Sequence, residues 1–374
     1  MTFSSANAIV YDGFEALELY SEVIEAGDAE EEQDEYISYI IQKVKVRILD
    51  KRFKDEEYDV IYSLQDATNT RLPLYTKLKV GDKVYVYGIY ENNVLDVQAV
   101  SYYDITPWVV ILFIIFAILI VLIGRKNGLK ALASLILTVV LIFAYLIPAI
   151  LDSRNPILCT VLLCTIVIVL TFIIIGGLKK KTLVAIIGTT AGVVAAAVLG
   201  SAFSHAMRLT GVNEHARMIS IMVNEEKAMI DFKGVLLSAI MISAMGACMD
   251  IGMSISSALT ELKEKKPDLT QKELIKSGMN IGKDVMGTMT NTLILAYVGS
   301  AMLCILLYNV NGFDLPNILH QEDISNEIIK SLAGSIGLVC TIPFTAVFGG
   351  LIIGKADKKK EDIEKPIPVK FFQG

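Results

Sequence analysis

Polar side chains interrupt two long apolar runs of this 374-residue sequence, and they are the residues best suited to chemistry. Asp250 lies inside the run at 233–258, whereas Asp284 and Asn291 lie near the start of the run at 285–308. A charged side chain in hydrocarbon is stable only where protein, water or an ion faces it, so such residues commonly mark ion or solute pathways. The alternative is structural, with Asp250 reaching the membrane interface or forming a buried hydrogen bond.

Helical periodicity gathers these residues on two faces. The face of the first run contains Ser243, Gly246, Asp250, Ser254 and Ser257. The face of the second run contains Asp284, Gly287, Thr288 and Asn291. Because a short connector joins the two runs, they are predicted to be antiparallel neighbours. We therefore predict an intramembrane polar site built from Asp250, Asp284, Thr288 and Asn291.

Metal-binding and catalytic signatures are missing from the sequence. A row of methionines could bind Cu(I), because thioethers suit that ion. No Cys or His lies at ligand spacing from the row formed by Met241, Met245, Met249 and Met253. Packing is therefore the favoured interpretation of the row. The five cysteines form no CxxC pair, and HExxH and GxSxG are absent. We expect no metal, no cofactor and no enzymatic activity.

A stripe of small residues predicts close helix packing. Small side chains recur every fourth residue at Gly188, Gly192, Ala196, Gly200 and Ser204. Such a stripe lets a neighbouring backbone approach, so the three glycines are predicted packing residues. The partner is another helix of this chain or a second copy in a homo-oligomer, and the sequence leaves both open.

The apolar segments as a whole predict a membrane-embedded helical bundle. Hydrophobic residues make up 53% of the chain, and the mean hydropathy is +0.55. A run of about 18 apolar residues is long enough to span a bilayer. A transmembrane domain over residues 107–355 is predicted, with seven spans at 107–124, 128–150, 156–177, 182–207, 233–258, 285–308 and 328–354. Pro343 is expected to break the last span, and residues 213–230 are expected to form an amphipathic or re-entrant segment.

The polar N-terminal part predicts a small β domain preceded by an acidic segment. Residues 1–41 form the acidic segment, with 11 Asp and Glu from Asp12 to Glu35 and no apolar core of a signal peptide. We predict an amphipathic helix at 11–26 and a solvated linker after it. Residues 42–106 alternate apolar and polar side chains in four or five runs, which predicts an OB-like or SH3-like barrel.

Charge asymmetry sets the predicted orientation. Residues 1–106 hold 10 Lys and Arg against 21 Asp and Glu, whereas the loops at 125–130, 178–182, 259–283 and 355–370 hold 3, 3, 6 and 6 basic residues. Basic loops stay cytoplasmic, so the β domain is predicted outside and the basic tail at 356–374 inside. The pattern resembles no nucleic-acid surface, and the lipid bilayer is the predicted partner. An outer domain of this size needs an anchor helix or another route of export.

Several strings resemble a known family. GACMDIGMSISSAL at 246–259 and TNTLILAYVGSA at 290–301 are the most specific, and VGDKVYVYG and GRKNGLKAL precede them. Over about residues 42–355 the chain resembles the YibE/F-like bacterial membrane proteins. The resemblance implies a multi-pass protein of the bacterial plasma membrane, with an anchor helix before the β domain that this sequence does not contain. It implies no biochemical activity, and it draws attention to Asp250, Asp284, Thr290, Asn291 and Thr292 without assigning them roles.

Two functions follow from these features. The first is a permease, in which buried carboxylates and a polar half-helix form a midplane site for an ion or small polar solute. The alternative is a non-transporting membrane scaffold or envelope-assembly factor, whose outer β domain binds a protein partner. Normal flux through both the Asp250→Asn and the Asn291→Ala variants would dismiss the first, and retained function after deletion of residues 42–104 would dismiss the second.

Overall fold

The chain forms two compact units, Met1–Leu119 and Ile120–Gly374. The computed structural model describes residues 8–11, 14–33, 38–63, 76–222 and 230–355. The basic tail predicted at 356–374 therefore lies outside the described residues.

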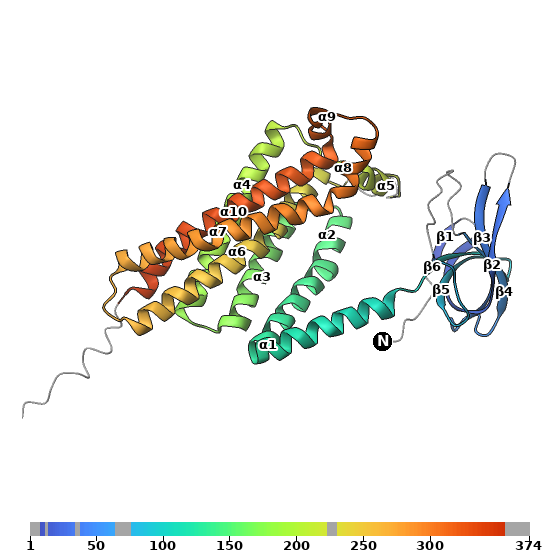
Figure 1. Ribbon diagram of the computed structural model, residues 1–374, viewed down its shortest axis with the longest axis horizontal. Helices are drawn as coiled ribbons and strands as arrows, with labels where there is room; N and C mark the ends of the chain where they lie inside the picture. The colour runs from blue at the N-terminus through green and yellow to red at the C-terminus, as the bar shows by residue number, and fades with distance from the viewer. Residues whose placement is uncertain (1–7, 12–13, 34–37, 64–75, 223–229, 356–374) are drawn as a thin grey trace, which may run out of the picture. The chain divides into compact units, whose positions relative to one another are not determined.

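The first unit contains a closed five-stranded barrel with one added strand (Figure 1). Its strands are β1 (Ala8–Tyr11), β2 (Phe14–Gln33), β3 (Ser38–Ile48), β4 (Glu57–Ser63), β5 (Lys83–Glu91) and β6 (Val94–Tyr103). The sheet order is β1-β2-β3-β4-β6-β5, and β5 also pairs with β2, which closes the barrel. The β4–β6 pairing is parallel, and the other pairings among the described strands are antiparallel. This arrangement fits the OB-like alternative, a five-stranded Greek-key barrel.

The acidic N-terminal stretch belongs to this barrel, so the helix predicted at 11–26 is wrong. The segment is the long strand β2, in which Leu17, Leu19 and Val23 are buried at the two-residue spacing of a strand. The acidic run predicted as a linker continues the same strand as far as Gln33. The sheet therefore starts well before residue 42.

Basic residues of neighbouring strands explain why so acidic a segment can be a strand. Glu22 of β2 lies 2.9 Å from Lys83 of β5, and Glu30 lies 3.1 Å from Lys43 of β3. Opposite charges placed across adjacent strands stabilise a sheet by a few tenths of a kcal/mol up to about 1 kcal/mol per pair. The acidic character of β2 is thus complementary to the strands on either side.

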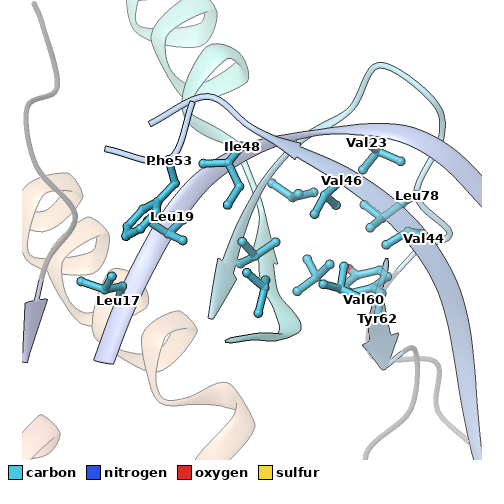
Figure 2. Packing of buried hydrophobic residues seen from close by; sticks show 14 of the residues in the cluster. Leu17, Leu19, Val23, Val44, Val46, Ile48, Phe53, Val60, Tyr62 and Leu78 are labelled. Carbon is cyan, nitrogen blue, oxygen red and sulfur yellow. The ribbon is translucent and has the colours of Figure 1, made fainter. Parts of the chain in front are cut away.

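The barrel closes around an apolar core. Figure 2 shows the side chains that meet inside the curl of the strands, among them Leu17, Leu19, Val23, Val44, Val46, Ile48, Phe53, Val60, Tyr62 and Leu78. One polar residue, Gln42 of β3, is also buried, with 1% of its surface exposed. Its amide nitrogen donates to the carbonyl oxygens of Gly27 at 2.9 Å and Leu78 at 3.0 Å, and its oxygen accepts from the Leu78 N–H at 2.8 Å. Gln42 therefore links β3 to β2 and to the segment that precedes β5.

Replacing Gln42 with leucine is expected to destabilise the barrel by about 3 kcal/mol, because three backbone groups would lose their partners inside the protein. Hydrogen exchange of the full-length protein in detergent measures the effect as faster exchange of the barrel amides. Gln98→Leu is the matched control, since Gln98 is exposed and its amide makes one 3.4 Å hydrogen bond, to Asp96. Equal exchange in the two variants would show that the Gln42 network is dispensable.

The second unit is a bundle of long apolar helices (Figure 1). The helical elements are α1 (Thr106–Leu141, which begins in the first unit), η1 (Ile142–Leu146), α2 (Ile147–Leu151), α3 (Pro156–Gly176), α4 (Lys180–Ala206), α5 (Glu214–Met222), α6 (Phe232–Lys265), α7 (Gln271–Ser300), α8 (Met302–Val310), α9 (Leu315–Leu319) and α10 (Glu322–Ile353). Among the described residues five helices are long and apolar enough to cross a membrane, or six if the bent pair α7–α8 is one span. The helix α5 occupies the first half of the predicted amphipathic segment.

Arg125 interrupts the first of these helices. Its backbone angles, φ 47° and ψ −125°, are not helical. The apolar run that contains it, Thr106–Leu151, has 46 residues and would extend about 69 Å as one helix. That length is more than twice the hydrocarbon thickness of about 30 Å. The run therefore consists of two helices, and the break falls between the predicted spans 107–124 and 128–150.

The small-residue stripe of α4 packs within the chain. A Cβ atom on Gly188 would collide with Thr345 of α10, and one on Gly192 would collide with Thr341 of the same helix. Gly200 faces α6 instead, where the nearest side-chain atom would lie 3.0 Å from its Cβ. The backbones of α4 and α10 thus approach too closely for any side chain at two of these positions.

Pro343 does not break the last helix, so that prediction is wrong. α10 continues from Glu322 to Ile353 with Pro343 in its interior. Proline removes one hydrogen bond of the helix. The helices α4, α6 and α7 all pack against α10, and these contacts keep it helical. Helices in membranes tolerate proline when neighbouring helices support them in this way.

The methionine row of α6 faces the interior. Met241 and Met245 are buried in a cluster with Cys164 and Cys248, and Met249 packs against the same cluster. These side chains fill the space between α3, α4 and α6.

Candidate functional site

The polar site predicted from the sequence lies on α6 and α7, which form a helical hairpin. α6 starts at Asp231, whose carboxylate accepts the Gly234 N–H at 2.9 Å. α7 starts with a capping box, in which Thr270 accepts the Glu273 N–H at 3.3 Å and Glu273 accepts the Thr270 N–H at 2.8 Å. The connector between the helices is five residues long, 266–270. So short a connector makes the two helices antiparallel neighbours, as predicted.

Contacts at both ends of the hairpin establish how its helices are aligned. A Cβ atom on Gly282 of α7 would lie 3.1 Å from Ile255 of α6. Farther along, Leu293 of α7 and Ser243 of α6 both come within 4 Å of the Cβ position of Gly334 in α10. Both helices rise about 1.5 Å per residue, so the alignment between these points follows directly.

This alignment places Asp250 between the other predicted residues. Asp250 is level with Gly287, and Asn291 is level with Gly246, about 6 Å closer to the start of α6. Asp284 is about 4.5 Å from the level of Asp250 in the opposite direction. The two carboxylates and the amide are therefore distributed over two helical turns of one hairpin.

All four predicted site residues are exposed on the surface of the isolated chain. The side chains of Asp250, Asp284 and Asn291 make no hydrogen bond or ion pair with any residue that the structure describes. The Thr288 hydroxyl donates to the Val285 carbonyl oxygen of its own helix at 3.0 Å. The permease hypothesis expected buried carboxylates, and this expectation is not met within a single chain, because Asp250 and Asp284 are both exposed.

The position of Asp250 along α6 makes this exposure significant. It lies about 17 Å from Glu261 and about 26 Å from Lys233, the nearest charged residues of the helix on either side. Space is also available beside it, since Cβ atoms on Gly246 and Gly287 would meet nothing within 4 Å. A carboxylate at this depth requires water, an ion or another protein surface against it.

The arrangement suits the exchange of a proton or a weakly held cation. A carboxylate accepts a proton or binds a cation, and an asparagine carbonyl oxygen is a further cation ligand. Within the described residues no three His, Cys, Asp or Glu side chains come together in a group that could hold a metal ion.

Sequence reasoning missed a second group of polar residues, in the first turns of α10. Asn326 and Glu327 fall in the segment predicted as a loop, whereas the helix already begins at Glu322. Lys330 lies inside the span predicted at 328–354, and a lysine in an apolar run was the signal that could have identified the group.

Comparison with known proteins assigns the chain to a family. No curated relative and no solved structure matches it. The model of the family described as YibE/F-like protein matches residues 112–355, which include every helix of the hairpin and its packing partners and leave the barrel outside the match. That match covers more than half of the chain, and the helices it covers are apolar enough to cross a bilayer. The chain is therefore a membrane protein of the YibE/F-like family.

Proposed function

We propose that this protein is a permease of the bacterial plasma membrane, with the exposed face of α6 and α7 as its conducting surface. Asp250 takes up a proton or a small cation, and Asp284 and Asn291 provide neighbouring oxygen ligands one turn away on either side. The Thr288 hydroxyl oxygen, whose proton is used within its helix, adds an acceptor on the same face.

The proposal includes a topology of seven spans. The break at Arg125 supports two spans in the run that ends at Leu151, and α7 with α8 supports one bent span. Basic residues collect in the loops at 125–130, 178–182 and 259–283, which supports a cytoplasmic position for those loops. The barrel is then outside the cell and the C-terminus inside.

One observation carries the proposal: the carboxylate of Asp250 is exposed at the middle depth of a membrane helix and has no partner among the described residues. Lipid cannot solvate that charge, so water, an ion or another protein surface must face it, and the first two are what a permease supplies. Open space beside Gly246 and Gly287 at the same levels supports such access.

Flux measurements on the purified full-length protein test the proposal. The protein is reconstituted into liposomes that contain the pH dye pyranine, and a potassium diffusion potential is imposed with valinomycin. We expect internal acidification faster than in protein-free liposomes, or uptake of ²²Na⁺ above the same background. If both rates equal those of protein-free liposomes, the permease proposal fails, and the scaffold with a partner-binding β domain becomes the better hypothesis.

A further inference from the structure

A cavity of about 610 Å³ lies at the end of the bundle where α10 begins. It is open on one side and is lined by α2, the loop before α5, α5, α6, the α7–α8 bend and α10, all within the second unit. Most of its wall is apolar, with side chains such as Ile147, Ile150, Ile219, Phe232 and Leu236. Its size and composition are those of a small-molecule site, which is typically a mainly apolar pocket with few polar groups.

The polar groups of the cavity come mainly from the first three turns of α10. Asp323, Asn326, Glu327 and Lys330 line it from this helix, at the spacing of one helical face. Asn326 is the most informative of them, because only 6% of its surface is exposed and its Oδ1 atom has no hydrogen-bond partner. Buried polar atoms in proteins are almost always hydrogen-bonded, so this acceptor points to a donor supplied by a ligand.

The charges around Asn326 favour a cation. Glu327 and Lys330 form an ion pair with each other, so their charges compensate. The Asp323 carboxylate accepts a hydrogen bond from the Tyr308 hydroxyl at 3.2 Å and forms no ion pair with a described residue. His215 and Asn213 also line the cavity. One carboxylate without an ion pair and one unpartnered acceptor oxygen therefore lie in a largely apolar pocket.

The wall of the cavity is held in place before any ligand enters. Glu322 accepts hydrogen bonds from the Thr210 N–H at 2.6 Å, the Thr210 hydroxyl at 2.7 Å and the Gly211 N–H at 2.9 Å. These bonds join the loop after α4, which contributes Gly211 to the cavity, to the start of α10. A pre-formed site loses little free energy to ordering when it binds.

We propose that this cavity binds a small organic ammonium ion with an apolar body. The ammonium group donates hydrogen bonds to Asn326 Oδ1 and to the Asp323 carboxylate, and the body packs against the isoleucines and Phe232. An organic cation is favoured over a metal ion because the described residues contain no metal-ligating group of three His, Cys, Asp or Glu. This site is separate from the Asp250 face and does not depend on the proposed permease activity.

Three probes with the same phenyl body distinguish the ligand chemistry. Isothermal titration of the full-length protein in detergent compares 2-phenylethylammonium, 2-phenylethanol and phenylacetate, which carry a positive, a neutral and a negative head group. We expect the ammonium ion to bind at least about tenfold more tightly than either of the other two, since charge-assisted hydrogen bonds are roughly twice as strong as neutral ones.

Variants of α10 identify the binding groups. Asn326→Leu and Asp323→Asn are each expected to weaken binding of 2-phenylethylammonium by about tenfold. Ser331→Ala is the matched control, because Ser331 is also buried on α10 with an unpartnered hydroxyl but does not line the cavity. It is expected to bind as the wild type does. The melting temperature of each variant shows whether it is folded, and Asp323→Asn keeps the test valid if Asn326→Leu does not fold.

Three results would overturn the proposal. Equal affinity for the ammonium ion and the alcohol would make the cavity a merely apolar pocket. Tighter binding of phenylacetate would assign the site to Lys330 and to anions. Unchanged binding in folded Asn326→Leu and Asp323→Asn variants would place the ligand elsewhere. None of these results affects flux through the Asp250 face, and a negative flux assay does not alter the binding measurement.

Discussion

Replacing Gly192 with alanine is expected to lower the free energy of unfolding of the helical unit by about 2 kcal/mol. The added methyl group would collide with Thr341 of α10, and its carbon would lie 2.7 Å from the Gly337 carbonyl oxygen and 3.1 Å from Cys248 Sγ. Two of these contacts are with the helix that packs most extensively against α4, so relief requires the backbones to separate. Separation removes van der Waals contacts along the whole length of the pair.

Gly246→Ala is the matched control for this prediction. A Cβ atom on Gly246 meets nothing within 4 Å, and alanine favours the helix over glycine by about 1 kcal/mol. The control is therefore expected to be as stable as the wild type or slightly more stable. Unfolding by titration with SDS, followed by circular dichroism, gives both values. Equal loss in both variants would show that the α4–α10 contact does not limit stability.

Replacing Asp250 with asparagine is expected to reduce flux in reconstituted liposomes by at least about tenfold, which corresponds to about 1.4 kcal/mol on the barrier. Asparagine preserves the size of the side chain and can still accept a hydrogen bond, but it neither binds a proton at neutral pH nor carries a charge. No described neighbour bonds to the Asp250 carboxylate, so the substitution breaks no hydrogen bond or ion pair and the variant should fold normally.

Ser254→Ala is the control for the Asp250 prediction. Ser254 lies one turn along the same exposed face of α6, and its replacement removes a polar group without removing a charge. Its flux is expected to stay within about twofold of the wild type, a change below about 0.5 kcal/mol. Wild-type flux through a folded Asp250→Asn variant would remove Asp250 from the pathway. A comparable loss in Ser254→Ala would mean that the whole face, and not the carboxylate, governs flux.

Spacing in the sequence was sufficient to identify the packing glycines of α4, but not what they pack against. A four-residue period of small side chains depends only on helical geometry. Its complement on α10 consists of Thr341, Thr345 and Gly337, which follow the same period. Threonine does not by itself indicate a helix contact, because its hydroxyl can bond within its own helix, as those of Thr341 and Thr345 do.

The apolar run and the helix begin at different residues in α7, which explains why the predicted span starts later than the helix does. The apolar run begins near residue 285, but the helix begins at Gln271, one residue after the capping-box threonine. The Thr270 and Glu273 spacing is a sequence signal of a helix start and could have been used. Lys272, Glu273 and Lys276 then occupy a helical extension beyond the apolar region.

The misinterpretation of the acidic strand β2 has a different cause. Its apolar residues fit a helix and a strand about equally well over a short window. Whether the segment forms a helix or a strand depends on residues distant in sequence, because Lys83 and Lys43 supply the charges that make an acidic strand favourable. No local pattern contains that information.

The polar residues of α6 and α7 could be picked out from the sequence, whereas their exposure could not, and their role as a site stays a prediction. Asp250, Asp284, Thr288 and Asn291 stand out in an apolar context and share helical faces. Which side of each helix packs against α10 depends on side-chain fit along the bundle, and it leaves all four residues on the outer surface of the isolated chain. The same fit gathers Asn326 and Lys330 around a cavity that no linear pattern contains.

The glycines of the bundle have unequal surroundings, and this has a consequence for substitutions. Gly188 and Gly192 are locked against α10, whereas Gly246, Gly287 and Gly299 have open space where a side chain would be. An added side chain at Gly188 or Gly192 would therefore force α4 and α10 apart, whereas the three other glycines lie on the outward surface of α6 and α7, where a side chain meets no neighbour. Larger side chains at these outward positions should therefore alter the surface that α6 and α7 present to their surroundings while leaving the bundle folded.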